Sequence, residues 1–416
     1  MKKLLKVTAM TGSLTLLKML IGFIIAKIVA IYTGPSGMAL LGQIQSLVNA
    51  FNGVINAPVS NSVIRYTAEH HEDGYEACSP WWRAALFWML ALYIILLPIG
   101  LFLDHYLSQW LFGGAEYQWV IYLAVFVLPF TATGTLVNSV INGLQNYKLY
   151  VFFGIVSVSV SGAVMTALII RWNIDGALIA AALQSALIGI SLIVMSIKQP
   201  WFKFSLWFGN IDKKALADTW GYIVMAIITA IAMPVALMLI RNLLVANEGW
   251  AAAGMWQSVW KISEVYLGVC TMALSAYYLP RLSKISDYYS IKHEIWNTAK
   301  IIIPIVIIMA ITIYLLRDVV ITVLFTEQFR NARDLFGIQL MGDVVKIASW
   351  LYAFPMIARN ATKWFVASEV FFSATLVVMS YYFILHFGIQ GANIAYLLNY
   401  TLYFIFVVTN LKRISS

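Results

Sequence analysis

Apolar residues run along this chain in long stretches, and polar positions between those stretches are few. A helix that crosses the hydrocarbon core of a bilayer needs about 20 apolar residues, at about 1.5 Å of rise each. The runs therefore predict twelve membrane-spanning helices that follow one another with short turns. The predicted spans are 7–32, 38–66, 81–103, 117–143, 147–170, 175–197, 215–242, 249–280, 296–316, 332–358, 363–386 and 389–411.

The composition agrees with this pattern. Of the 416 residues, 62% are hydrophobic and only 11% are charged, whereas soluble domains average about 45–50% apolar and about 25% charged residues. The turns between spans leave no room for a separate soluble domain. The predicted fold class is an all-α integral membrane protein, which excludes a water-soluble enzyme.

Basic residues are unevenly shared between the two sides of the predicted bundle. Of 27 Lys and Arg residues, eighteen lie on the side of the N-terminus and five on the other side. Since Lys and Arg are retained in the cytoplasm during insertion, both termini are predicted to be cytoplasmic. The net charge of +9 follows from this retention on loops that face anionic lipid, so the predicted partner is the bilayer and not nucleic acid.

The sequence predicts neither a disulfide nor a metal site. Cys78 and Cys270 fall at different predicted depths, and no metal-ligand spacing is present. The five histidines lie in or near predicted loops. Any proton coupling is therefore expected to run through carboxylates.

An internal repeat divides the chain. The pattern Gly-x-x-Gln-Ser at 42–46 recurs at 254–258, an offset of 212, and Ile-x-Gly-Ala-x-Ile-Ala at 174–180 recurs at 389–395, an offset of 215. Both copies begin on the cytoplasmic side, which predicts two parallel six-helix lobes of the kind found in alternating-access transporters. The predicted division is an N-terminal lobe at 1–198, a basic cytoplasmic linker at 199–214 and a C-terminal lobe at 215–416.

Polar stripes mark the faces of these helices that cannot lie against lipid. The second span carries Gln45, Asn49, Asn52 and Asn56 on one helical face. Hydrocarbon cannot satisfy these amides, so they are predicted to line a hydrated cavity and to bind substrate. Hydrogen bonding between helices is the alternative and stays open for such groups.

Ionisable residues inside spans add to this cavity, because a charge near the bilayer centre is costly and normally faces water, a partner or a substrate. Lys261 and Glu264, like Asp343 and Lys346, are three positions apart and can pair on their own helix. The two lysines are candidate substrate ligands. The two carboxylates are the candidate ion-coupling residues.

Three basic residues of the first lobe complete the candidate set. Lys18 lies within the first span and has no intramembrane carboxylate in its own lobe, which leaves a surplus of positive charge there. Lys27 is close enough to the outer end of that span to snorkel. Arg65 and Arg241 lie at span ends, as interfacial anchors do. Arg65 is retained as a substrate candidate.

The chemistry of these side chains indicates the class of ligand. Amides and hydroxyls suit sugars, which both donate and accept hydrogen bonds, and an unpaired ammonium suits phosphate. The predicted substrate is an amphiphile with a phosphorylated and glycosylated head. Trp256, Trp260 and Trp350 lie close to the stripes and are candidates for stacking on sugar rings.

Two segments resemble a known family. Residues 329–346, which include Asp343 and Lys346, are similar to the helix 10 region of the Wzx-type flippases of Gram-negative bacteria. The first helix pair, with Lys18, Lys27 and the turn at 33–37, resembles the same family. These flippases belong to the polysaccharide transporters of the multidrug/oligosaccharidyl-lipid/polysaccharide exporter superfamily.

The resemblance implies two pseudo-symmetric lobes around a central cavity that alternates its opening. It also implies translocation of an undecaprenyl-pyrophosphate-linked oligosaccharide to the periplasmic leaflet of the bacterial inner membrane, for O-antigen or enterobacterial common antigen. No cofactor is expected, and H⁺ or Na⁺ is the candidate counter-ion. The pathway's polymerase and chain-length regulator are the expected protein partners.

Two other readings remain open. A MATE-like multidrug exporter would share the lobes and the span count, although it should favour acidic residues where this chain has Lys18. A membrane-embedded polymerase or glycosyltransferase would act on the same lipid-linked substrate. Such an enzyme needs a poised acid, base or nucleophile, and the two candidate carboxylates each have a basic neighbour.

Overall fold

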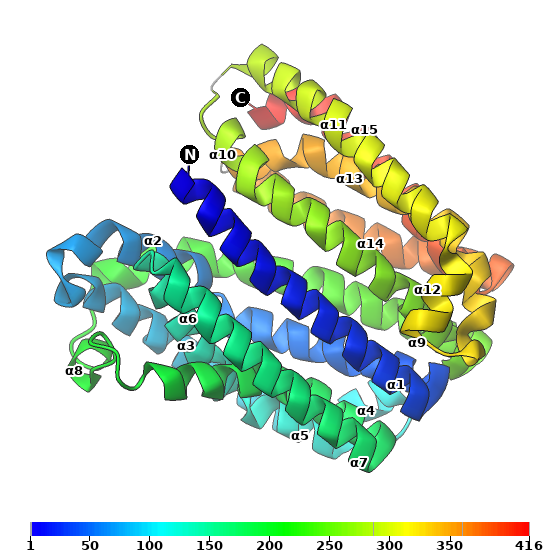
Figure 1. Ribbon diagram of the computed structural model, residues 1–416, viewed down its shortest axis with the longest axis horizontal. Coiled ribbons are helices and arrows are strands. Elements are labelled where there is room, and N and C mark those ends of the chain that lie inside the picture. Colours follow the sequence, from blue (N-terminus) through cyan, green and yellow to red (C-terminus); the bar gives the residue numbers. More distant parts are fainter. Residues whose placement is uncertain (1, 286, 360, 416) are drawn as a thin grey trace. The chain divides into compact units, whose positions relative to one another are not determined.

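The computed structural model describes residues 2–285, 287–359 and 361–415, which form helices joined by short turns and contain no strand within these ranges (Figure 1). The elements are α1 (Lys2–Asn56), α2 (Ser60–His70), η1 (His71–Asp73), α3 (Tyr75–Phe102), α4 (Asp104–Phe112), η2 (Ala115–Tyr117), α5 (Gln118–Phe126), α6 (Leu128–Gly143), α7 (Tyr147–Ser196), α8 (Phe204–Trp207), α9 (Lys213–Ala273), η3 (Leu274–Tyr278), α10 (Leu279–Leu282), α11 (Tyr288–Leu315), α12 (Arg317–Leu324), η4 (Glu327–Leu335), α13 (Phe336–Ala358), α14 (Thr362–Phe387) and α15 (Ile389–Ser415).

Nine helices in the described ranges are long and apolar enough to cross a membrane. Three of them, in α1, α7 and α9, are 47, 50 and 48 residues long, whereas a bilayer core takes about 20. Each is interrupted by one residue with non-helical backbone, at Gly34, Asn173 and Gly249. Taken as two spans each, these three helices bring the number to the predicted twelve.

The interruptions repeat along the chain. Gly34 (φ 63°, ψ −166°) has its counterpart in Gly249 (φ 83°, ψ 170°), and Asn173 (φ 48°, ψ −116°) in Gly388 (φ 56°, ψ −141°). Both pairs are 215 positions apart. Positive φ is unfavourable for residues with a side chain, so glycine at three of the four positions is what this geometry requires. The matched turns support the internal repeat and give it one common offset.

A close approach after the second turn also repeats. A Cβ at Gly176 would lie 2.0 Å from the carbonyl oxygen of Leu168, and one at Gly391 would lie 2.2 Å from that of Phe383. These pairs are again related by 215 positions. The recurring glycine therefore lets the chain turn back tightly against the preceding span in both halves.

The first compact unit contains residues up to Tyr32 and Gln43–Val235. Within it α6 packs along α7, and α2 packs against both α3 and α6. Gly134 of α6 and Gly189 of α7 make this packing close, since a Cβ on Gly134 would lie 2.2 Å from the Cα of Gly189.

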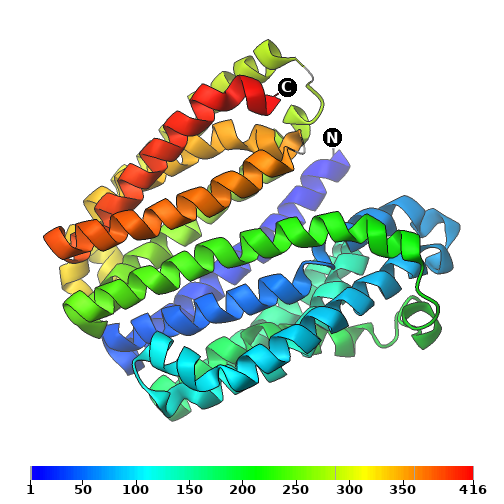
Figure 2. The ribbon, with the colours of Figure 1, turned by 180° about the vertical axis from the view of Figure 1, so that it is seen from behind.

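The second compact unit contains Thr33–Gly42 and Ala236–Ser416. Within it α13 and α14 both pack against α15, and α11 packs against α13 (Figure 2). Helix α11 is capped by Asp287, whose carboxylate accepts a 2.8 Å hydrogen bond from the backbone N–H of Ser290; this bond lowers the pKa of the Asp287 carboxyl.

The predicted lobe limits at 198 and 214 stay a prediction.

Two segments expected to be loops are helical. The stretch between the third and fourth predicted spans contains α4 and η2, and the stretch between the ninth and tenth contains α12 and η4. Asp104 at the start of α4 accepts a 2.7 Å hydrogen bond from the Tyr122 hydroxyl of α5, and Gly113 ends α4 in the left-handed conformation. Short helices in such turns satisfy their own backbone groups, which favours them beside a membrane.

Candidate functional site

Helix α13 presents a row of polar and aromatic side chains on one face, as its sequence predicts. Gln339, Asp343, Lys346 and Trp350 are spaced four, three and four along the helix, so they share a side. Gly342 beside them is needed for packing, because a Cβ there would lie 2.4 Å from the ring of Tyr396. The glycine thus lets α15 bring Tyr396 against the polar face of α13.

The carboxylate of Asp343 is fully buried and accepts hydrogen bonds from three hydroxyls. Its Oδ2 accepts from Ser263 Oγ at 2.6 Å and from the Tyr266 hydroxyl at 2.7 Å. Its Oδ1 accepts from the Tyr396 hydroxyl at 2.8 Å, and Gln339 Nε2 approaches it at 3.3 Å. Donors from α9, α13 and α15 therefore hold this anion in one orientation.

The ammonium of Lys346 is surrounded by aromatic rings. Its Nζ lies 5.0 Å from the ring centroids of Trp350 and Tyr400, and 5.5 Å from those of Trp260 and Tyr396. Each ring face attracts a cation, and the attraction strengthens where water is excluded. We call Lys346 and these four rings the aromatic cage.

The spacing of Asp343 and Lys346 allows an ion pair, but within the described ranges no ion pair of 4.0 Å or less joins them. Hydroxyls from neighbouring helices donate hydrogen bonds to the carboxylate, and aromatic rings surround the ammonium. The predicted pair of Lys261 and Glu264 is present, with Nζ and Oε2 3.2 Å apart. Glu264 also accepts a 3.2 Å hydrogen bond from Trp260 Nε1 of the aromatic cage.

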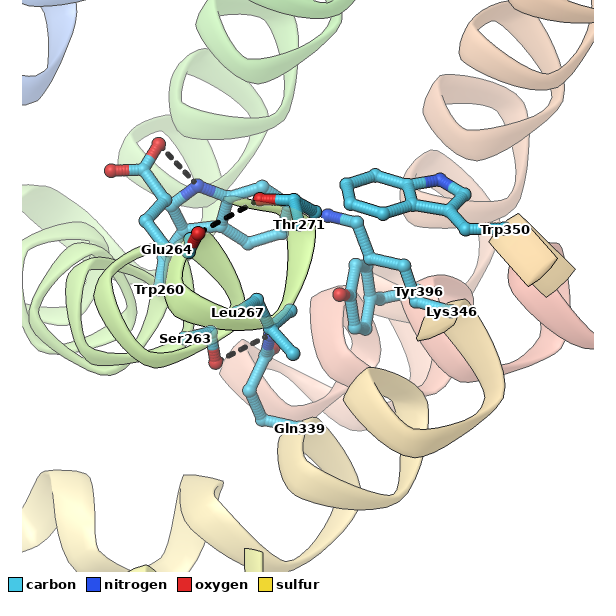
Figure 3. A pocket seen from close by; sticks show the side chains of 10 residues that line it. Trp260, Ser263, Glu264, Leu267, Thr271, Gln339, Lys346, Trp350 and Tyr396 are labelled. Atoms are coloured by element: carbon cyan, nitrogen blue, oxygen red, sulfur yellow. Dashed lines mark hydrogen bonds between the residues drawn. The ribbon is translucent and has the colours of Figure 1, made fainter. Parts of the chain in front are cut away.

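A pocket of about 150 Å³ opens between these groups. Figure 3 shows Trp260 and Glu264 from α9 at one side of it, and Lys346, Trp350 and Tyr396 at the other. Ser263 and Gln339 meet at its floor through a 3.2 Å hydrogen bond. An ammonium, a carboxylate and several ring faces thus converge on one small space, as in a site for a polar ligand with a flat or ring-shaped part.

The candidates of the first unit are arranged differently. Lys18 and Asn49 are exposed, and Gln45 and Lys27 are half-buried. Asn52 donates a 3.0 Å hydrogen bond to Ser185 Oγ of α7, so this amide joins two helices, the alternative that the sequence left open. Two residues complete the set: the Oδ1 of Asn56 is buried without a hydrogen bond, and Arg65 at the end of the second span pairs with Glu69 at 2.8 Å.

Sequence reasoning missed several members of the site. Ser263, Tyr266 and Tyr396 belong to it only because α9 and α15 pack against α13. Arg241, expected at an interface, is only 2% exposed, and its Nε donates a 2.9 Å hydrogen bond to Gln257 Oε1. Ser263 and Tyr266 lie in α9 and Tyr396 lies in α15, so no spacing within the span of Asp343 relates them to it.

The chain matches the family model described as polysaccharide biosynthesis protein over residues 4–286. It is 30% identical over 407 residues to the lipid III flippase of Escherichia coli (strain K12), with 96% of each chain covered. The chain belongs to this polysaccharide biosynthesis protein family. The lipid III flippase of Shigella flexneri matches to the same extent.

Solved structures show the same fold. An inward-facing multidrug resistance MATE family transporter of the MOP superfamily matches with a TM-score of 0.74 and 12% identity, over 95% of each chain. The inward closed conformation of the lipid II flippase MurJ matches with a TM-score of 0.71 and 12% identity, over 98% of this chain and 87% of that one. The predicted fold, an all-α multi-pass bundle of the MATE type, is confirmed, as is the predicted family.

Metal binding has no support in the described ranges, where no group of three or more His, Cys, Asp or Glu side chains could hold a metal ion. Cys78 and Cys270 are both buried free thiols.

Proposed function

We propose that this protein is a flippase that moves an undecaprenyl-pyrophosphate-linked oligosaccharide from the cytoplasmic to the periplasmic leaflet by alternating access. The observation that carries the proposal is the pocket in the second unit, where the ammonium of Lys346 lies among four aromatic rings and the carboxylate of Glu264 also lines the space. The relationship to the lipid III flippase, which extends over nearly the whole chain, supports the same class of cargo.

The aromatic cage suits the sugar part of such a substrate. Ring faces such as those of Trp260 and Trp350 stack on the apolar faces of sugar rings, and Glu264 accepts hydrogen bonds from hydroxyls. The ammonium of Lys346 attracts the pyrophosphate. In the first unit, the exposed Lys18 adds positive charge without an ion-pair partner among the described residues.

Coupling to H⁺ or Na⁺ is assigned to Asp343, with Glu264 as the second carboxylate. Asp343 is the buried anion of the second unit on which the most hydrogen bonds converge. The amide oxygen of Gln339, four residues earlier on the same helix, is buried and has no hydrogen bond. A proton on Asp343, or a cation between these oxygens, would change which hydrogen bonds the carboxylate accepts. Because the donors lie on α9 and α15, the packing of these helices on α13 would change as well.

The proposed location is the bacterial inner membrane, with both termini cytoplasmic. The supporting observation is the excess of Lys and Arg on alternate loops. The polymerase and the chain-length regulator of a surface glycan pathway are the proposed partners. The cargo is proposed to be a repeat unit of O-antigen or of enterobacterial common antigen.

Complementation tests this function. The gene is expressed in one bacterial strain that lacks its lipid III flippase and in another that lacks its O-antigen flippase. Restored common antigen or a restored lipopolysaccharide ladder, scored by immunoblot, is the expected result and identifies the glycan. Lys18→Ala should lower the restored glycan several-fold at an unchanged protein level, whereas Lys148→Ala, at the predicted cytoplasmic end of the fifth span, should not.

Proteoliposomes provide the direct measurement. A fluorescent polyprenyl-pyrophosphate disaccharide is placed in both leaflets, and an impermeant quencher is added outside. Without the protein only the outer-leaflet fluorescence should be quenched, and with the protein the inner-leaflet fluorescence should be quenched as well. If neither glycan is restored and no flipping occurs, while the protein is in the membrane and raises the resistance of cells to cationic drugs, the chain is a drug exporter instead.

A further inference from the structure

The segment between α7 and α9 is built onto the first unit. Arg83 of α3 donates to the backbone carbonyl oxygens of Ser205 at 2.5 Å and Asn210 at 3.3 Å, and Ser79 Oγ donates to that of Leu206 at 2.5 Å. The Trp207 ring stacks on Trp82 with centroids 4.9 Å apart. This linker is therefore held in a defined position beside α3 (Figure 1).

A cavity of about 420 Å³ lies between the linker and helices α3, α6 and α7. Its volume is in the range of about 300–1,000 Å³ that is usual for small-molecule sites. Leu136 and Val137 of α6 and the rings of Phe204 and Trp207 are among the residues that line it. The hydroxyl of Thr133, which also faces it, donates to the Pro129 carbonyl oxygen of its own helix at 2.8 Å. The wall is therefore effectively apolar.

One charged group borders this cavity, the ammonium of Lys203, and no acidic residue lines it. Lys203 is exposed, and its ammonium makes no ion pair with any residue in the described ranges. Phe204 and Phe208 stack on each other with centroids 4.3 Å apart and are 76% and 55% exposed. Large exposed aromatic side chains beside a lysine are typical of a surface that meets lipid headgroups.

We propose that this cavity binds one anionic phospholipid, with an acyl chain between α6 and the linker and the phosphate against Lys203. The occupant must combine hydrocarbon with an anion, because the cavity offers apolar walls and one ammonium. The segment is predicted to be cytoplasmic and is rich in lysine, with Lys198, Lys203, Lys213 and Lys214. The proposed site therefore lies at the surface of the cytoplasmic leaflet, whose anionic lipids attract basic residues. This site is separate from the aromatic cage and does not depend on the proposed function.

The purified full-length protein in detergent, titrated with phosphatidylglycerol or phosphatidylcholine, tests the proposal by native mass spectrometry. One phosphatidylglycerol should remain bound in preference to phosphatidylcholine. Lys203→Ala should weaken the binding of phosphatidylglycerol about fivefold and leave that of phosphatidylcholine unchanged, since one lysine near an anionic lipid has roughly that effect. Lys213→Ala, which removes another exposed lysine at the start of α9 that does not line the cavity, is the matched control and should change neither.

Thr133→Phe fills the cavity from a half-buried position and should reduce the binding of both lipids. Equal phosphatidylglycerol binding by the Lys203→Ala and unmodified proteins would overturn the proposal, as would an equal loss in Lys213→Ala. Retention of lipid by a monodisperse Thr133→Phe protein would show that the cavity is not the site. Displacement of phosphatidylglycerol by equimolar undecaprenyl phosphate would assign the cavity to a polyprenyl carrier and reject the phospholipid.

Discussion

The polar groups of the two units differ in how firmly they are held. In the second unit the Asp343 carboxylate accepts hydrogen bonds from neighbouring helices, and Lys346 is enclosed by four rings. In the first unit Lys18 and Asn49 are exposed. A ligand group held in place beforehand binds without losing side-chain freedom, whereas a mobile one can follow a cargo of variable shape. The second unit therefore carries the preorganised part of the proposed site.

The strongest test of this contrast is Asp343. Asp343→Ala removes the acceptor of three buried hydroxyls, and each buried donor left unsatisfied costs about 1–3 kcal/mol. We expect a loss of about 3 kcal/mol or more in the free energy of unfolding, measured by thermal denaturation in detergent, together with loss of glycan export.

Asp343→Asn separates the structural role from the coupling role. The amide keeps one oxygen acceptor and the same shape but cannot take up a proton. The variant should fold and should transport without any dependence on pH or Na⁺ in proteoliposomes. An ion dependence equal to that of the unmodified protein would make Asp343 a purely structural residue, and Glu264→Gln would then be the variant to examine.

A smaller effect is expected at the centre of the aromatic cage. Lys346→Met removes the charge but fills the space with a thioether that packs well against aromatic rings, so stability should fall by less than about 1.5 kcal/mol. Export of the glycan should fall about tenfold, because the attraction between cation and phosphate is lost. Lys346→Arg should keep part of the activity. Undiminished export by a folded Lys346→Met protein would remove this residue from the substrate site.

The smallest effect concerns the amide stripe of the second span. Asn52→Ala and Ser185→Ala should each destabilise the protein by about 1 kcal/mol or less, and the double variant by less than their sum, because the two side chains share one hydrogen bond. Asn49→Ala should leave stability unchanged and reduce export. The reverse pattern, with Asn49 stabilising the fold and Asn52 affecting only export, would contradict the roles given to these two residues.

The sequence pattern was most informative for the spans, where lipid requires apolar residues along the whole helix. The apolar runs predicted the number of spans, since lipid imposes the same requirement along a whole helix. The three long helices α1, α7 and α9 show the limit of this reasoning. Their turns at Gly34, Asn173 and Gly249 are single residues with special backbone geometry, and composition alone does not distinguish them from other residues between spans.

Local spacing also identified the right face of α13, because positions three and four apart on a helix must lie together. It did not identify partners. The spacing allowed both pairs, yet among the described residues Lys261 pairs with Glu264 and Asp343 does not pair with Lys346. Equal spacing permits an ion pair, and the competing groups on neighbouring helices decide whether one is made.

The amino-acid sequence by itself predicted a multi-pass helical membrane protein with an internal repeat, because the apolar runs and the repeated motifs are local features of the chain. Only the tertiary structure decided what the buried charges contact. Ser263 and Tyr396 reach Asp343 across 80 and 53 positions of sequence, and Tyr400 reaches Lys346 from another helix. Such contacts depend on which helices pack together, and no local pattern encodes that choice.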